Sequence, residues 1–199
     1  MAEHSEIEAG LPVRAGKAHS MRAMRLPLVC AVLLPAILAG AQPGPRVPAN
    51  GSFEALDVAT GLPAGWTLWN PSHNLCCYTL AMAHDGVAAA SVTDDGPVES
   101  QGLRSPRAAI VAGQTYRATA YVWITDLQAG SFAVYLEFWQ GDQRVLDRAV
   151  STAQCGEWVE LNVSGTAPAG AREATVLIYG SSATVGHAYF DDVSLVEVP

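Results

Sequence analysis

Asp191 is the residue of this sequence whose surroundings most need a chemical explanation. In the segment AYFDDVSLV (residues 188–196), a strand would place Asp191 on the same apolar face as Val193 and Leu195. An unpaired carboxylate in a core is costly, so such a group is normally neutralised, paired or bound to a cation. The segment therefore predicts either a hydrogen-bonded carboxylate or a metal ligand.

Recognisable catalytic motifs are absent from the sequence. It contains no G-x-S-x-G, H-E-x-x-H or P-loop motif. A glycosidase would need two carboxylates across the scissile bond. Glu137 with Glu160 or Asp126 is a conceivable pair, but nothing in the spacing requires it. We therefore predict that the protein is not an enzyme.

Aromatic side chains gather on one face of a predicted hairpin. Residues 114–125 and 131–140 both alternate, and the short segment DLQAG lies between them. The apolar faces would carry Tyr116, Ala118, Ala120, Val122 and Ile124 in the first strand and Phe132, Val134, Leu136 and Phe138 in the second. The shared outer face would carry Tyr121, Trp123, Tyr135 and Trp139, beside Glu137 and Arg117.

Such a surface has the chemistry of a carbohydrate site. Flat rings can stack on the C–H faces of sugars, while neighbouring Glu and Arg groups bind hydroxyls, and large exposed aromatic clusters usually mark binding surfaces. The alternative is that a neighbouring loop covers these rings and makes them part of the core. The exposure of the four rings would decide between the two.

The first 41 residues are set apart from the folded domain. Residues 21–41 have the basic, apolar and small-residue regions of a secretory signal peptide, in that order. The apolar run from Leu26 to Leu38 is shorter than the roughly 20 residues of a spanning helix, so we expect no stable membrane insertion. A retained N-terminal anchor is the alternative. Residues 1–20 are expected to be a non-structured extension or a mis-assigned start, and 42–49 a leader. The protein is predicted to be secreted, to the extracellular space or the cell surface.

The charge of residues 42–199 restricts the ligands that the domain can bind. Seven arginines, no lysine and sixteen acidic residues give this part a net charge of −9. An acidic domain without a basic patch argues against nucleic acid, whose affinity comes largely from phosphate neutralisation. It also argues against polyanionic glycans. Neutral ligands and cations remain.

Three cysteines, Cys76, Cys77 and Cys155, follow the signal peptide. A bond between the neighbours would be strained, because adjacent Cα atoms are about 3.8 Å apart and disulfides prefer roughly 4.4 to 6.8 Å. On a strand the two neighbours face opposite ways, so only one can reach Cys155. We expect one disulfide to Cys155 and one remaining thiol. Metal binding by the three cysteines is a weaker alternative, because no histidine or fourth cysteine stands at a recognisable spacing.

The chain after the leader reads as many short alternating segments broken by turn residues, with no amphipathic helix and no internal repeat. Regularly spaced short strands in a secreted chain favour an all-β fold, a two-sheet antiparallel β-sandwich or jelly roll. We place this domain at residues 50–199.

The order of motifs along residues 50–196 resembles that of carbohydrate-binding modules of families 4, 9 and 22. The resemblance rests on NGSFEALDVATGLPAGWTLW near the start, VAGQTYRATAYVW in the middle, and EWVELNVSGTAPAGAREATVLIYG followed by GHAYFDDVSL at the end. It implies a galactose-binding-like jelly roll that binds a neutral polysaccharide of the β-glucan or xylan class in a cleft across one sheet. It also implies a structural Ca²⁺ where the first and last strands meet, with Glu54 and Asp191 as ligands and Asp192 as a second ligand from the last strand.

The ligand site that the resemblance implies combines aromatic rings with two charged side chains. It comprises Tyr121, Trp123, Tyr135, Glu137, Trp139 and Arg117, with Trp69 at the rim. Trp66 and Trp158 match structural positions and are expected in the core. The segment NPSHNLCCYTL (residues 70–80) departs from the family pattern. The predicted function is a secreted, non-catalytic carbohydrate-binding module; the alternative is a structural or adhesive extracellular domain without sugar binding.

Overall fold

The structure, a computed structural model, describes residues 48–73 and 75–199. The predicted extension and signal peptide, and residues 42–47 of the leader, lie outside the described residues. Every regular element in the described part is a β-strand. Within these two ranges, no helix is long and apolar enough to cross a membrane.

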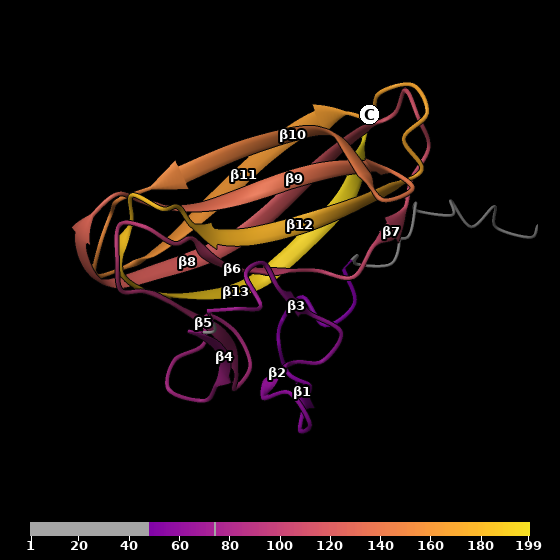
Figure 1. The fold of residues 1–199 in the computed structure, drawn as a ribbon. Coiled ribbons are helices and arrows are strands. Elements are labelled where there is room, and N and C mark those ends of the chain that lie inside the picture. Colours follow the sequence, from indigo (N-terminus) through magenta and orange to yellow (C-terminus); the bar gives the residue numbers. More distant parts are fainter. Residues whose placement is uncertain (1–47, 74) are drawn as a thin grey trace, which may run out of the picture. The chain divides into compact units, whose positions relative to one another are not determined.

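Two antiparallel sheets form a β-sandwich (Figure 1). The strands, in chain order, are β1 (Leu56–Asp57), β2 (Leu62–Pro63), β3 (Thr67–Leu68), β4 (Cys76–Thr79), β5 (Ala89–Asp94), β6 (Gln101–Arg104), β7 (Ala108–Ala109), β8 (Thr115–Ala129), β9 (Phe132–Gln140), β10 (Gln143–Thr152), β11 (Trp158–Thr166), β12 (Glu173–Gly180) and β13 (Val185–Val198). The six-stranded sheet has the order β10-β9-β12-β6-β3, with β7 also paired to β12. The five-stranded sheet has the order β11-β8-β13-β5-β4, and β1 pairs with β2 separately.

Alternation along the long strands builds the core between the sheets. The apolar set expected on β8 is buried at every position, and so is the set expected on β9. Phe190 of β13 and Phe53, just before β1, are also fully buried. The predicted all-β sandwich and both predicted apolar faces are therefore confirmed.

The predicted hairpin between residues 114–125 and 131–140 is wrong. β8 pairs with β11 and β13, whereas β9 pairs with β10 and β12, so the two strands belong to opposite sheets. Thr184 holds the corner between them: its hydroxyl donates to the Ser131 carbonyl at 2.8 Å and accepts from the Ser131 N–H at 3.3 Å. An inward apolar face is needed both by hairpin partners and by strands that pack across a sandwich, so alternation alone does not separate the two cases.

The predicted disulfide is also wrong, since no bond joins Cys155 to Cys76 or Cys77. Cys155 bridges to Ile124 of β8, whereas Cys76 and Cys77 lie on β4, three strands from β8 in the same sheet. Cys155 lies on the β11 side of β8, because β13 pairs with Ile124 on the other side. Four strand spacings of about 4.8 Å, roughly 19 Å, therefore separate it from β4. That is nearly three times the Cα distance of roughly 7 Å that a disulfide tolerates.

Candidate ligand-binding faces

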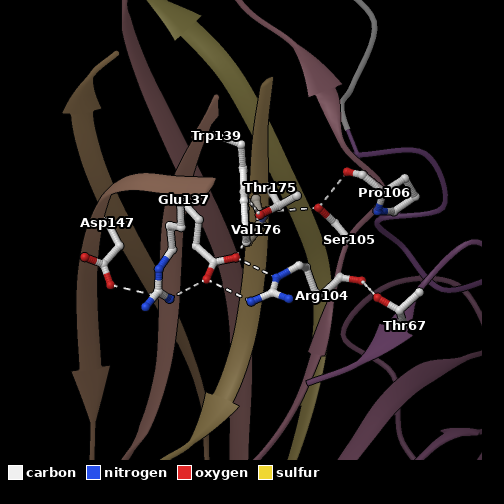
Figure 2. A network of polar contacts seen from close by, with 10 residues as sticks. Thr67, Arg104, Ser105, Pro106, Glu137, Trp139, Asp147, Thr175 and Val176 are labelled. Carbon is white, nitrogen blue, oxygen red and sulfur yellow. Dashed lines mark hydrogen bonds and ion pairs between the residues drawn. The ribbon is translucent and has the colours of Figure 1, made fainter. Parts of the chain in front are cut away.

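The outer face of the six-stranded sheet holds a carboxylate that solvent does not reach. Glu137 lies in β9 opposite Thr175 and Asp147 and is 0% exposed. Its Oε2 accepts hydrogen bonds from Arg104 Nε at 2.7 Å and from Thr175 Oγ1 at 2.8 Å. Its Oε1 accepts from Arg104 Nη2 at 3.1 Å and from Arg144 Nη1 at 2.7 Å (Figure 2). Both oxygens are therefore saturated by donors.

The same donors keep Glu137 ionised. Burial by itself raises the pKa of this carboxyl, but the hydrogen bonds and charge of Arg104, with hydrogen bonds from Arg144 and Thr175, outweigh it. The pKa of Glu137 therefore lies below its ordinary value, and the hydrogen bond to Glu137 raises the pKa of Arg144. Glu137 thus anchors two guanidinium groups in charge-assisted bonds, which are strong and directional.

Arginine side chains lie over the tryptophan rings of this face. The guanidinium carbon of Arg104 is 4.6 Å from the ring centroid of Trp69 and 5.0 Å from that of Trp139. Arg107 lies 4.6 Å from the Trp139 centroid. These are cation–π distances. As a result, Trp139 is only 8% exposed, although it points away from the core.

Two tyrosines extend the ring cluster. Tyr179 of β12 contacts Trp69 edge-on at 5.7 Å between centroids and Tyr135 of β9 at 5.4 Å. All three rings are half-buried. We call this surface the six-stranded face and define it by Trp69, Arg104, Tyr135, Glu137, Trp139, Arg144 and Tyr179.

A second aromatic surface lies on the opposite sheet. Trp158, Trp123 and Tyr189 stand in register on the adjacent strands β11, β8 and β13. The rings of Trp123 and Trp158 meet edge-to-face at 5.9 Å. The prediction that Trp158 belongs to the core is wrong: it alternates with buried Leu161 and is half-buried on the outside. Trp66, at 4% exposure, does belong to the core, as predicted.

His84 covers one end of this second surface. Its ring stacks on Tyr121 at 3.7 Å and 12°, and its Nδ1 lies 2.8 Å from Asp192 Oδ2. Arg117 and Glu160 are exposed beside it along an open groove of about 640 Å³. We call Tyr121, Trp123, Trp158, Tyr189 and His84 the five-stranded face.

The predicted ligand site is therefore divided between two sides of the sandwich. Tyr121, Trp123 and Arg117 lie on the outer side of the five-stranded sheet. Tyr135, Glu137, Trp139 and Trp69 lie on the outer side of the six-stranded sheet or at its end. The predicted single row of rings does not exist, because β8 and β9 do not pair. Of the four rings expected to be open, Trp139 is buried and the other three are half-buried.

Sequence reasoning missed three residues that define the six-stranded face, Arg104, Arg144 and Tyr179, and the hydrogen-bond donor Thr175 that helps to hold Glu137. One signal was present: in EATVLIYG (residues 173–180), the apolar positions Ala174, Val176 and Ile178 leave Thr175 and Tyr179 on the outer side. The two arginines carried no comparable signal, because only the pairing of β9 with β10 and β12 brings them to Glu137.

The predicted calcium ligands are arranged differently from a metal site. Asp191 is fully buried, and its oxygens accept hydrogen bonds from the backbone N–H groups of His84, Asp85 and Asp192. Within residues 48–73 and 75–199, no group of three or more His, Cys, Asp or Glu side chains is placed to hold a metal. These donors do not fit a cation between Glu54 and Asp191. Calcium itself stays a prediction.

The carboxylate pair considered for a glycosidase does not assemble. Glu137 lies in the six-stranded sheet, whereas Glu160 and Asp126 lie in β11 and β8 of the five-stranded sheet. Glu137 has no free oxygen lone pairs to accept a proton from water or substrate, because four donors occupy its two oxygens. No inverting or retaining geometry is formed by these pairs.

Comparison with known proteins identifies the fold. No protein-family model and no curated protein matches the chain. Among solved structures, a family 16 carbohydrate-binding module is similar over 75% of this chain and 98% of its own, with a TM-score of 0.55 and 19% identity. The CBM22-2 xylan-binding domain of Paenibacillus barcinonensis Xyn10C is similar over 72% of this chain and 98% of its own, with a TM-score of 0.53 and 11% identity.

A tailspike protein is also similar. The enzymatically active domain of bacteriophage CBA120 tailspike protein 4 matches 77% of this chain with a TM-score of 0.61 and 12% identity. The match spans 21% of that chain, about a fifth of its length. At these identities the comparisons establish the fold: the chain is a jelly-roll β-sandwich of the kind found in carbohydrate-binding modules of families 16 and 22.

Proposed function

We propose that the chain is a secreted, non-catalytic module that binds a neutral polysaccharide of the β-glucan or xylan class on its six-stranded face. The observation that carries the proposal is the fully buried Glu137 on the outside of the sandwich, holding Arg104 and Arg144 beside a group of aromatic rings. A strand with only a structural role does not need a buried carboxylate that holds two arginines on its outer side. A ligand site gains from donors that are held in place before binding.

The hydrogen-bonding capacity of this face suits sugar hydroxyls. Arg104 uses Nε and Nη2 on Glu137, and its Nη1 has no partner among the described residues. Glu137, by contrast, has its acceptor capacity filled and acts through the arginines. We therefore assign hydroxyl recognition to Arg104 and Arg144 and stacking to the half-buried rings of Trp69 and Tyr135.

The charge of the face favours a neutral ligand. Its ion pairs are Arg104–Glu137, Arg144–Glu137, Arg144–Asp147, Arg107–Glu173 and Arg107–Asp142. Three guanidinium groups thus face four carboxylates, so the surface attracts neither anionic nor cationic chains strongly. The xylan-binding domain with the same fold is a precedent for this ligand class.

One observation favours the alternative, a structural or adhesive domain without sugar binding. Trp139 is buried, and Arg104 and Arg107 already lie over its ring. A sugar could not stack there without displacing an arginine. Arg104 also lies over the Trp69 ring, at 4.6 Å, but that ring is half-buried rather than buried. The proposal therefore places stacking on Tyr135 and on the part of Trp69 that Arg104 leaves accessible, with Trp139 as support.

Affinity electrophoresis of the full chain against soluble glucans, xylans and mannans tests the proposal. Trp69→Ala and Tyr135→Ala should each weaken retardation by a glycan at least about tenfold, the effect of roughly 1.4 kcal/mol. Trp123→Ala is the matched control, because it truncates a half-buried ring on the opposite side. Loss of binding in the control alone would move the site to the five-stranded face. No retardation by any glycan would favour the structural or adhesive role.

A further inference from the structure

The loop between β4 and β5 directs five consecutive backbone N–H groups at carboxylates. The N–H groups of His84 and Asp85 donate to Asp191 Oδ2 at 2.8 and 3.1 Å. Those of Val87 and Ala88 donate to Glu54 Oε1 at 3.0 and 3.3 Å. Between them, the N–H of Gly86 donates to the side chain of Asp85 at 2.9 Å. We call residues 84–88 with Glu54 and Asp191 the amide clasp.

The clasp joins three segments that are distant in the sequence. Glu54 belongs to the start of the described chain, residues 84–88 to a loop in its first half, and Asp191 to β13. A backbone hydrogen bond from Val193 to Gly51, at 2.8 Å, ties the same two ends a few residues away. The clasp therefore occupies the place where the family resemblance puts a structural calcium.

Gly86 is the residue that allows the loop to close. Its φ is +71°, in the left-handed region that side chains rarely adopt. A Cβ atom at this position would lie 2.1 Å from Glu54 Oε1. Any side chain here would push the Glu54 carboxylate off the N–H groups of Val87 and Ala88.

Amide donors and a calcium ion compete for the same oxygens. Calcium takes six to eight oxygen ligands at about 2.3–2.6 Å, and its positive charge repels the positive end of an N–H dipole. Three N–H groups already face the Asp191 carboxylate, which is fully buried, and two face Glu54 Oε1. Successive backbone N–H groups that point to one side of a loop form an anion-binding site, and here the bound anions are the protein's own carboxylates.

We propose that the amide clasp takes the structural role of a calcium ion at this position without any metal. Backbone N–H groups of residues 84–88 donate hydrogen bonds to the Glu54 and Asp191 carboxylates and so join the first segment to the last strand. The stability of the domain is then independent of calcium. It depends instead on a glycine at position 86.

Thermal unfolding of the full chain at pH 8 tests the metal independence. Burial raises the pKa of Asp191 to about 6, so its carboxylate is ionised at this pH. We expect the same Tm, within about 1 °C, in excess EDTA and in millimolar calcium chloride. A rise of about 4 °C or more with calcium, absent from Asp191→Asn, would overturn the proposal.

A double-mutant cycle tests the clasp itself. Gly61→Ala is the matched control for Gly86→Ala, because Gly61 has a φ of +73° and no atom within 4 Å of its added Cβ. Gly86→Ala should lower Tm by about 4 °C more than Gly61→Ala, since it also displaces Glu54. In a Glu54→Ala background that excess should vanish. Equal effects of the two glycine substitutions in the wild-type background would refute the clasp.

Discussion

At the scale of single residues, Glu137 shows how a buried carboxylate can fix the positions of charged side chains on a surface. Two arginines and Thr175 occupy both of its oxygens, so the carboxylate reaches a ligand only through the groups it holds. In the proposed binding site, Glu137 is a positioning residue. Arg104 and Arg144, held in this way, keep fewer rotamers in the free protein, which lowers the entropy lost on binding.

Glu137→Gln tests this positioning role. The amide keeps one acceptor oxygen but turns an NH₂ group toward an arginine, so we expect the free energy of unfolding to fall by about 2–4 kcal/mol. Glycan retardation should weaken as well, even though Glu137 contacts no sugar. Urea denaturation measures the first effect and affinity electrophoresis the second. Glu160→Gln, at an exposed position of the opposite sheet, should change stability by less than about 0.5 kcal/mol.

Asp94 should make stability depend on pH. It is 2% exposed, its Oδ2 has no hydrogen-bond partner among the described residues, and burial raises its pKa to about 6. Between about pH 4 and 6 the folded state therefore holds a proton that the unfolded state has lost, and stability falls as pH rises through this window. The change approaches about 2–3 kcal/mol for a shift of this size.

Urea unfolding at pH 4.5 and pH 7 measures this dependence. The contribution of Asp94 should make the free energy of unfolding of the wild type larger at pH 4.5 than at pH 7. Asp94→Asn should remove this contribution. Asp191, whose pKa is also raised to about 6 by burial, should leave a dependence of the same sign and similar size. Equal pH dependence in wild type and Asp94→Asn would contradict the assignment.

At the scale of elements, the long strands β8 and β9 decide which residues can act together. Each has one apolar and one polar face, but they turn into different sheets at Gly130 and Ser131. Gly130 has a φ of +76°, and an added Cβ would lie 2.6 Å from Thr184 Cα. The corner thus sends Tyr121 and Tyr135 to opposite sides of the molecule.

Strand order also decides whether the cysteines can form a disulfide. Cys77 lies on β4 and Cys155 forms an isolated bridge to β8; both are exposed, and they are too far apart to form a disulfide. We expect a reducing agent to leave Tm unchanged, and the variant with Cys77→Ser and Cys155→Ser to unfold within about 2 °C of the wild type. A fall of several degrees on reduction would show a stabilising disulfide, since such bonds typically contribute about 2–4 kcal/mol.

At the scale of the whole molecule, the sandwich presents two aromatic surfaces on opposite sides. The two sheets are separated by one core layer, about 10 Å thick in sandwiches of this kind. Three of the six arginines in the described part of the chain, Arg104, Arg107 and Arg144, belong to the ion pairs of the six-stranded side. This side therefore combines aromatic rings with guanidinium donors that carboxylates hold in place.

The five tryptophans report on the two sides separately. Trp66 is in the core, Trp69 and Trp139 are on the six-stranded face, and Trp123 and Trp158 are on the five-stranded face. On addition of a glycan that retards the protein in affinity electrophoresis, we expect the indole N–H signals of Trp69 and Trp139 to shift in a two-dimensional NMR spectrum. The signals of Trp123 and Trp158 should stay in place. The reverse pattern would assign the ligand to the other sheet.

By itself, the sequence determined the all-β class, the apolar faces of the long strands and the need to satisfy Asp191. These follow from alternation and from the cost of burying an unpaired charge, both of which are local properties. Tertiary structure alone decided that β8 and β9 separate, that Glu137 is buried between arginines, that Trp158 lies outside and that the cysteines are apart. Those outcomes depend on which strands pair, and pairing between distant segments leaves no signal in the alternation of either strand.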